Sequence, residues 1–358
     1  MSLSVRFTHR FESVALDIAF DAPPGVTCLF GPSGSGKTSV IRAVAGLLRP
    51  DQGEIRVQEH VLMDAQRFLP PHKRGLGYVF QDHRLFPHLN VAQNLAFGAR
   101  YAPKDAPEMA QDKVVDMLGI GGLLERRPSA LSGGEAARVA IGRALLARPR
   151  MILADEPLAS LDGARKAEIL PYFEMLRDEV DIPVLYVTHA MGEVARLATT
   201  VVALEGGRVQ KVGPALAVLS DPMVTPAGPR AAGAVIEARL VRHHADGLSE
   251  LEAGGVALFL PAVRANPGAK LRVRIAAQDV ILSSRPPEGL SALNVIPAHV
   301  LSLRTGQGPG ALVSLQSTAG RLLARVTARS AQAMGLAEGH AVWAVVKSVS
   351  VAPEDVGQ

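Results

Sequence analysis

The glycine-rich run GPSGSGKT at Gly31–Thr38 limits the fold of this chain more than any other stretch. It follows an apolar segment, Val26–Phe30, and precedes a helical pattern over Thr38–Leu47. Glycines at this spacing let the backbone turn its N–H groups toward a phosphate, and the helix that follows directs its N-terminus at the same anion. The order of strand, loop and helix predicts a nucleotide-binding α/β domain. The residues expected to contact the nucleotide are Gly31, Pro32, Ser33, Gly34, Ser35, Gly36, Lys37, Thr38 and Ser39.

Each polar residue of this run has an expected role. Lys37 would bind the β- and γ-phosphates, and the Thr38 hydroxyl would bind Mg²⁺. A second motif, MILADEP at Met151–Pro157, places two carboxylates at the end of an apolar strand, where α/β sheets bind their ligands. Asp155 would hold Mg²⁺ through water, and Glu156 would orient and deprotonate the attacking water. Together the two motifs predict a P-loop nucleotide hydrolase.

A third motif, LSGGE at Leu131–Glu135, begins a helical pattern that continues to Leu146. Ser132 and Glu135 have the spacing of a capping box. The motif also resembles the signature of the ABC ATPase family. That resemblance implies that Ser132 and the two glycines after it, Gly133 and Gly134, contact the γ-phosphate of ATP bound to the other subunit.

Further segments match this family in the expected order. Gln81 resembles the glutamine that senses Mg²⁺ and the attacking water, and His189 resembles the histidine that contacts the γ-phosphate. The segment Leu158–Asp162 resembles the loop that crosses the dimer interface and gives Asp162 as a nucleotide contact. Adenine would stack on an aromatic residue before the P-loop, with Phe11 as the candidate and Phe7 as the alternative.

The segment Lys73–Gly98 resembles the part of import-type ABC ATPases that docks on a membrane permease. The N-terminus lacks the apolar region of a signal peptide. The most apolar candidate for a membrane span, Val194–Leu204, is short and contains Arg196. We therefore expect a peripheral protein on the cytoplasmic face of the inner membrane, with a separate permease and, indirectly, an extracellular or periplasmic oxyanion-binding protein. One P-loop and one signature per chain imply a homodimer.

The chain changes character near residue 230. Prolines and glycines over Pro214–Pro229 interrupt regular structure, and short strand-like runs follow. We predict an ATP-binding α/β domain with a helical subdomain over residues 1–229. A small β-barrel of the oligonucleotide-fold type would follow over residues 230–358. Its expected strands are Ala234–Val241, Val256–Leu260, Lys270–Ile275, Val295–Leu303, Ala311–Leu315, Leu322–Val326 and Ala341–Val349.

Residues 290–352 resemble the molybdate-binding (Mop) domain, and Ala234–Ser283 is similar to molybdate-import ATPases. The Mop family reads Ser-Ala-Arg-Asn at its first motif, whereas this chain has Leu293 in place of the arginine, which puts one cation of the site in doubt. The resemblance implies molybdate as a regulatory ligand as well as the transported anion, with tungstate nearly equivalent. The implied oxyanion contacts are Ser291, Asn294, Thr327, Ser330, Lys347 and Ser348.

Composition narrows the remaining function classes. The formal net charge is +4 over 358 residues, and no Lys/Arg block is dense enough to predict nucleic-acid binding. The single cysteine, Cys28, excludes an internal disulfide and is expected in the core. Three alternatives stay open: an importer of sulfate, iron or polyamine, a soluble non-transport ABC ATPase, and a molybdate store or regulator.

Overall fold

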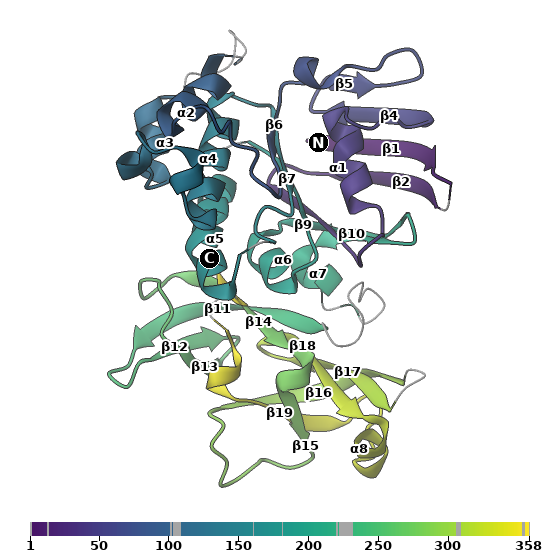
Figure 1. Cartoon of the computed structure of the whole chain (residues 1–358). Helices are drawn as coiled ribbons and strands as arrows, with labels where there is room; N and C mark the ends of the chain where they lie inside the picture. Colours follow the sequence, from purple (N-terminus) through teal and green to yellow (C-terminus); the bar gives the residue numbers. More distant parts are fainter. Residues whose placement is uncertain are drawn as a thin grey trace. The chain divides into compact units, whose positions relative to one another are not determined.

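The computed structural model describes residues 2–12, 14–100, 102, 109–159, 161–180, 182–219, 221, 232–305, 309–352 and 355–357. The chain divides into two compact units (Figure 1). The first comprises Met1–His189 and Leu197–Gly213, and the second comprises Ala190–Arg196 and Pro214–Gln358. The domain boundary predicted at residue 229 lies outside the described residues, so it stays a prediction.

A ten-stranded sheet forms the centre of the described part of the first unit, in the order β5–β4–β1–β2–β10–β9–β3–β8–β7–β6. Its strands are β1 (Leu3–Arg10), β2 (Ala15–Ala22), β3 (Val26–Phe30), β4 (Gln52–Val57), β5 (His60–Met63), β6 (Leu76–Val79), β7 (Met151–Asp155), β8 (Val184–Thr188), β9 (Thr200–Glu205) and β10 (Arg208–Pro214). Strands β9, β3, β8, β7 and β6 run parallel, whereas β4, β1 and β2 pair antiparallel. The parallel half therefore brings the ends of several strands to one edge.

Figure 1 shows α2, α3 and α4 gathered into a helical lobe beside this sheet, which confirms the predicted helical subdomain. The α-helices of the chain are α1 (Lys37–Ala45), α2 (Val91–Arg100), α3 (Gln111–Met117), α4 (Gly133–Leu146), α5 (Gly163–Glu179), α6 (Met191–Leu197), α7 (Ala215–Leu219) and α8 (Ala328–Ala333). Short 3₁₀ turns are η1 (Pro71–Lys73), η2 (Gly121–Leu123), η3 (Pro128–Ala130), η4 (Ala277–Asp279) and η5 (Ser348–Ser350). Among the described residues, no helix is both long enough and apolar enough to cross a bilayer.

The apolar runs of the sequence become the buried strands of this unit. Every residue of β3 is buried, including Cys28, whose predicted place in the core is confirmed. Helix α1 ends two residues before its predicted end, because Gly46 adopts a left-handed conformation (φ 80°) that closes the last turn. Its apolar face packs with β1, β2, β4 and β5 into one core.

The described part of the second unit contains two five-stranded antiparallel sheets that share one hydrophobic core, together with short helices. Their orders are β13–β12–β11–β14–β20 and β15–β19–β16–β17–β18. The strands are β11 (Gly233–His243), β12 (Leu248–Ala253), β13 (Val256–Pro261), β14 (Lys270–Ala276), β15 (Val280–Ser283), β16 (Asn294–Thr305), β17 (Gly310–Ser317), β18 (Gly320–Thr327), β19 (Ala341–Val346) and β20 (Val356–Gly357). The predicted all-β architecture is confirmed.

Several details of the second unit differ from the prediction. Strands β12, β15 and β20 were not predicted, because they are short or carry glutamates on their exposed face. The last predicted strand ends at Val346 and not at Val349, since Ser348–Ser350 turns into a 3₁₀ helix.

Candidate functional site

The loop after β3 has a conformation that requires glycine. Gly34 and Gly36 have φ values of 81° and 103°, in the left-handed region. A Cβ on Gly31 would lie 2.2 Å from the carbonyl oxygen of Leu204 and 2.7 Å from Oγ of Ser35. The loop therefore folds tightly against the end of β9 and delivers the chain into α1 at Lys37.

Two polar side chains are enclosed by this loop. Lys37 is 5% exposed, and its Nζ donates to the carbonyl oxygens of Gly31 (2.8 Å) and Pro32 (2.9 Å). Burial lowers the pKa of Lys37, while the nearby carboxylates of Glu156 and Asp155 act in the opposite direction. Oγ of buried Ser35 has no hydrogen-bond partner within the described chain. An ammonium and an unpaired hydroxyl in a glycine-lined loop fit a phosphate group.

Among the other predicted contacts, Ser33 and Thr38 are exposed, and Pro32 and Ser39 are half-buried.

The two carboxylates at the end of β7 occupy different surroundings. Oδ2 of Asp155 accepts a hydrogen bond from the Tyr78 hydroxyl at 3.0 Å, and burial raises the pKa of Asp155. Burial also raises the pKa of Tyr78 far above its usual range, so its hydroxyl remains a donor. Tyr78 was not predicted from the sequence. The feature of the sequence that could have indicated a role for Tyr78 is its position on β6, three residues before Gln81.

Glu156 combines an unusual backbone with a defined partner. Its φ is +46°, which non-glycine residues rarely adopt, and its N–H donates to the carbonyl oxygen of Val187 on β8. Oε2 of Glu156 lies 3.2 Å from Nδ1 of His189. The turn thus brings together two of the predicted catalytic residues, which come from neighbouring strands.

The strand order explains why these residues meet. β3, β8, β7 and β6 are consecutive in the sheet and parallel, so their carboxyl ends share one edge. That edge carries the glycine-rich loop, then His189, then the two carboxylates, and then Gln81, which is exposed in the turn after β6. Segments more than 150 residues apart in the sequence are therefore assembled into one site.

The LSGGE motif lies elsewhere, at the start of α4 in the helical lobe. The predicted capping box is present: the Ser132 N–H donates to Oε2 of Glu135 (2.7 Å), and the Glu135 N–H donates to Oγ of Ser132 (3.3 Å). Gly133 and Gly134 form the first turn, and a Cβ on Gly133 would lie 2.9 Å from Cδ2 of Leu161. The signature motif therefore packs against the segment Leu158–Asp162, in which Ser160 lies outside the described residues.

Two other predicted contacts have clear structural environments. Asp162 caps α5, where its Oδ1 accepts from the Arg165 N–H at 2.9 Å. Phe7 is buried in the core, whereas Phe11 is 40% exposed and packs edge-on against His9, with ring centroids 4.5 Å apart. Phe11, and not Phe7, presents a ring that adenine could stack on.

The six predicted oxyanion contacts fall into two groups in the second unit. Asn294 pairs with Val346 at the junction of β16 and β19, which places Ser291 and Asn294 near Lys347 and Ser348. Oγ of Ser348 is buried and has no partner in the described residues.

Thr327 is the last residue of β18, and Ser330 lies in α8, the helix that follows. Thr327 is opposite Gly310, beside the far end of the twelve-residue strand β16. There Thr327 caps α8, and its Oγ1 lies 2.8 Å from Oγ of Ser330. Within one chain, the strand pairing therefore does not bring Thr327 and Ser330 close to the group around Asn294.

Asn294 already has partners. It is 1% exposed, its Oδ1 accepts from the Phe259 N–H at 2.6 Å, and its Nδ2 donates to the Phe259 carbonyl at 3.0 Å. These bonds fasten β16 to β13. Leu293 is 52% exposed.

Comparison with known families and proteins agrees with this architecture. The family model described as ABC transporter matches residues 16–159, and the TOBE domain model matches residues 290–353. The molybdenum import ATP-binding protein of Rhizobium meliloti is 50% identical over 98% of this chain and 99% of its own length. The protein of the same name from Mesorhizobium japonicum is 48% identical, covering 98% of this chain and 96% of its own.

A solved structure resembles the first unit as well. The nucleotide-free ATP-binding cassette of an ABC transporter aligns with 62% of this chain and 96% of its own, with 25% identity and a TM-score of 0.53.

Proposed function

Since the chain belongs to the family of molybdenum import ATP-binding proteins, we propose that it hydrolyses ATP to drive molybdate import through a separate membrane permease. The observation that carries the proposal is the edge at β3, β8, β7 and β6, where a phosphate-binding loop, two carboxylates, a histidine and a glutamine converge. Tungstate, a tetrahedral dianion of similar size and charge, would be imported with molybdate.

The residues divide the work of hydrolysis. The loop and Lys37 bind the β- and γ-phosphates, and Phe11 stacks on adenine. Glu156 accepts a proton from the attacking water, and His189, 3.2 Å from it, holds the carboxylate in place and contacts the γ-phosphate. Mg²⁺, held by Thr38, Gln81 and Asp155, would neutralise charge that develops on the phosphates. Tyr78 fixes the orientation of Asp155 through its hydrogen bond.

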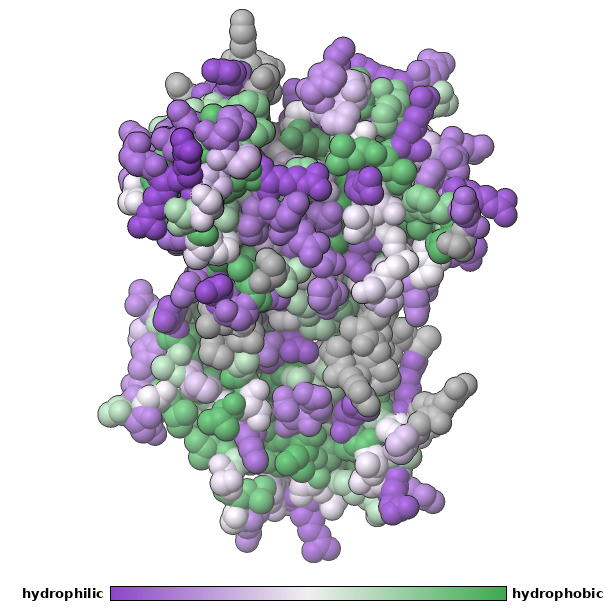
Figure 2. All heavy atoms as spheres, in the orientation of Figure 1, coloured by the Kyte–Doolittle hydropathy of each residue, from purple (hydrophilic) through white to green (hydrophobic). Residues whose placement is uncertain are grey.

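The complete site needs a second copy of the chain. Ser132, Gly133 and Gly134 belong to the helical lobe and would reach the γ-phosphate held by the partner subunit, with Asp162 at the same interface. Figure 2 shows hydrophobic side chains on the visible face of the second unit. The exposed large apolar residues of the described part of this unit include Ile281, Leu290, Leu293 and Val349. This surface supports a contact between the second units of a homodimer.

The permease would dock on the surface that begins at Gln81 and continues through α2 to Gly98, on the cytoplasmic face of the membrane. The second unit would bind molybdate as a regulator through the two groups of polar residues described above. Because these groups lie at opposite ends of β16, molybdate would contact one group unless a second subunit supplied the other.

The experiment that tests the function is uptake by reconstituted vesicles. The chain is co-purified with its permease, and import of labelled molybdate is measured with ATP, with ADP, and with ATP plus excess sulfate or excess tungstate. We expect ATP-dependent import of molybdate, which excess tungstate reduces and excess sulfate does not. Import of sulfate in preference to molybdate would assign the protein to a different importer, and ATP hydrolysis with no uptake of any anion would contradict the transport role.

A further inference from the structure

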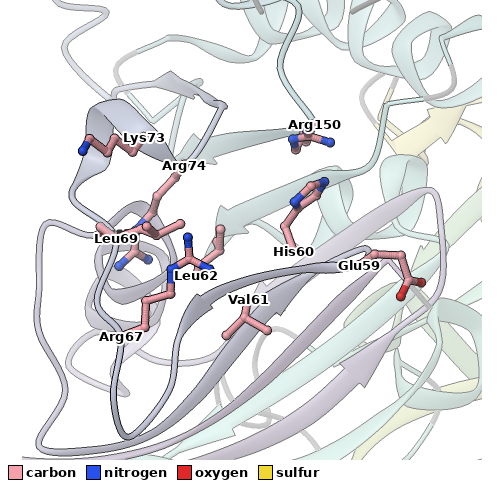
Figure 3. A pocket seen from close by; sticks show the side chains of 9 residues that line it. All are labelled: Glu59, His60, Val61, Leu62, Arg67, Leu69, Lys73, Arg74 and Arg150. Carbon is pink, nitrogen blue, oxygen red and sulfur yellow. Dashed lines mark hydrogen bonds between the residues drawn. The ribbon is translucent and has the colours of Figure 1, made fainter. Parts of the chain in front are cut away.

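A pocket of about 430 Å³ lies in the first unit among residues that the nucleotide site does not use (Figure 3). Its walls come from β5, from the segment between β5 and β6, and from the residue before β7. The charged and titratable residues in the walls are Glu59, His60, Arg67, Lys73, Arg74 and Arg150. The lining contains four permanent cations and a single carboxylate, so the pocket is electropositive.

The pocket is separate from the nucleotide-binding edge. Arg150 immediately precedes β7, whose other end carries Asp155. A five-residue strand separates its two ends by roughly 15 Å. A ligand in the pocket would therefore lie near the amino-terminal end of β7, whereas ATP would bind at the carboxyl ends of the parallel strands.

Arg74 places a buried positive charge in the wall of the pocket. It is 2% exposed, and its Nε donates to Leu69 O (2.7 Å) while its Nη1 donates to the carbonyl oxygens of Ala43 (2.8 Å) and Val44 (2.7 Å). Its Nη2 is buried with no hydrogen-bond acceptor in the described part of the chain. Burial lowers the pKa of Arg74 to about 10, which still leaves the guanidinium protonated at neutral pH. The carbonyls at the end of α1 offset part of this charge, and no salt bridge to Arg74 is found among the described residues.

The other cations of the pocket also lack a carboxylate partner in the described part of the chain. Among the residues that the structure describes, no salt bridge involves Arg67, Lys73 or Arg150. Figure 3 shows the guanidinium groups of Arg67 and Arg74 on one side of the pocket, and the carboxylate of Glu59 directed away from them. Arg67 and Lys73 are exposed, whereas Arg74 is buried, so the pocket is open to solvent and has a buried positive charge in its wall. Cations gathered around such a pocket favour an anionic ligand.

From this arrangement we propose that the pocket binds a phosphate group, carried either by a free anion or by the headgroup of an acidic lipid. Planar guanidinium groups match the oxygens of a phosphate with paired hydrogen bonds, which an isolated lysine does not do. Arg67 and Arg150, which reach the pocket from separate segments, would supply most of the contact, and Arg74 would supply the buried charge behind them. The proposal concerns a site apart from ATP hydrolysis and stands whichever anion the transporter imports.

The test uses the full-length chain with Lys37→Ala, which removes the main phosphate contact of the nucleotide loop. Inorganic phosphate is titrated into this protein by calorimetry, alone and with Arg67→Ala or Arg150→Ala added. We expect each added substitution to weaken binding about tenfold, since each removes a charge-assisted contact. The matched control is Arg56→Ala, because Arg56 lies on the neighbouring strand β4, is paired with Glu54, and does not line the pocket. ATPase rates of Arg67→Ala and Arg150→Ala without the Lys37 substitution should equal the wild-type rate and show that the fold is intact.

A second arm separates the two sources of phosphate. Binding to vesicles of phosphatidylglycerol and of phosphatidylcholine is measured by co-sedimentation. A defect of Arg67→Ala confined to phosphatidylglycerol vesicles would identify a lipid headgroup, and a defect confined to the calorimetric titration would identify a free anion. If Arg67→Ala and Arg150→Ala match Arg56→Ala in both assays, the pocket has no phosphate ligand and the proposal is overturned.

Discussion

Glu156 is the residue at which backbone strain and chemistry coincide. Its left-handed φ places the carboxylate beside Nδ1 of His189, and Asp155 keeps its own bond to Tyr78. Glu156→Gln preserves size and removes the base. We expect the variant to bind MgATP and dimerise but to hydrolyse at least about 100-fold more slowly, as for loss of a general base. Single-turnover hydrolysis measures this directly. The control is Glu205→Gln, at the exposed end of β9, and a near-normal rate for Glu156→Gln would remove Glu156 from the mechanism.

Asn294 illustrates a residue whose motif and structure suggest different roles. The Mop resemblance makes it an oxyanion contact, whereas its amide bonds to both backbone groups of Phe259 make it a link between β16 and β13. Asn294→Ala leaves those partly buried groups without the Asn294 partner and should destabilise the second unit by about 1–3 kcal/mol, even without molybdate. Thermal unfolding of the full chain, with exposed Ser291→Ala as the control, tests this. Unchanged unfolding would favour a purely ligand-binding role.

At the residue scale, local motifs in the sequence predicted where the candidate site residues lie, and the roles of these residues stay predictions. The loop at Gly31–Thr38 and the strand end at Asp155 were recognised from short motifs, and the structure places them at the ends of the parallel strands β3 and β7. Tyr78 and Arg74 could not be predicted in this way, because their roles depend on contacts with residues far away in the chain. No local pattern encodes such contacts.

Helix α4 begins with a cap whose strength depends on pH. The hydrogen bond from the Ser132 N–H holds the pKa of Glu135 below its ordinary value of 4.5. The ionised form is therefore favoured in the folded state, so its stabilisation is complete above pH 4.5 and is lost as the pH falls through the lower folded-state pKa. Glu135→Gln should lower the free energy of unfolding near neutral pH and converge with wild type in acid. The companion Ser132→Ala should cost about 1 kcal/mol near neutral pH. Part of that cost should also disappear in acid, because the Ser132 side chain contributes to lowering the pKa of Glu135. A Glu135→Gln deficit that stays constant with pH would contradict this account.

The same helix also positions the turn that follows Gln81. Arg143 donates from Nη1 to the carbonyl oxygen of Arg84 (2.7 Å) and from Nη2 to that of His83 (3.1 Å), and it lies 5.1 Å from the ring centroid of Phe86. We expect Arg143→Ala to lower the molybdate imported per ATP hydrolysed, because the proposed permease surface loses its link to α4, at a stability cost of about 2 kcal/mol. Arg143→Lys should recover part of the ratio.

The control for this prediction is Arg100→Ala, at the exposed end of α2. Import and hydrolysis are measured in the same vesicles. Parallel loss of both activities in Arg143→Ala would indicate general disruption of the fold and not uncoupling.

At the scale of the whole molecule, the order of elements was more predictable than their pairing. Alternating strands and helices predicted the parallel half of the first sheet, and short strands between turns predicted an all-β second unit. The division of that unit into two sheets was not predicted. It depends on β11 pairing with both β12 and β14, and on β16 pairing with β19 across more than forty residues of sequence. Such long-range pairing is decided by which apolar faces can share one core, as these two sheets do.

The dimer provides the last prediction, because the site at the strand ends lacks the signature motif that would complete it. A dimer of one Lys37→Ala chain and one Ser132→Arg chain contains one site with both residues intact, provided that the two residues come from different subunits. Neither homodimer contains such a site. An equimolar mixture after subunit exchange should therefore regain about a quarter of the wild-type ATPase rate, since half of the dimers are mixed and each has one of two sites. A mixture of Lys37→Ala with the Lys37→Ala/Ser132→Arg double variant has no intact site and should stay inactive. If exchange is verified and the first mixture is also inactive, either the signature acts within its own subunit or hydrolysis requires both sites. A covalently linked dimer with one wild-type half and one double-variant half separates these explanations, because it keeps activity only if each site is built from a single chain and one site is enough.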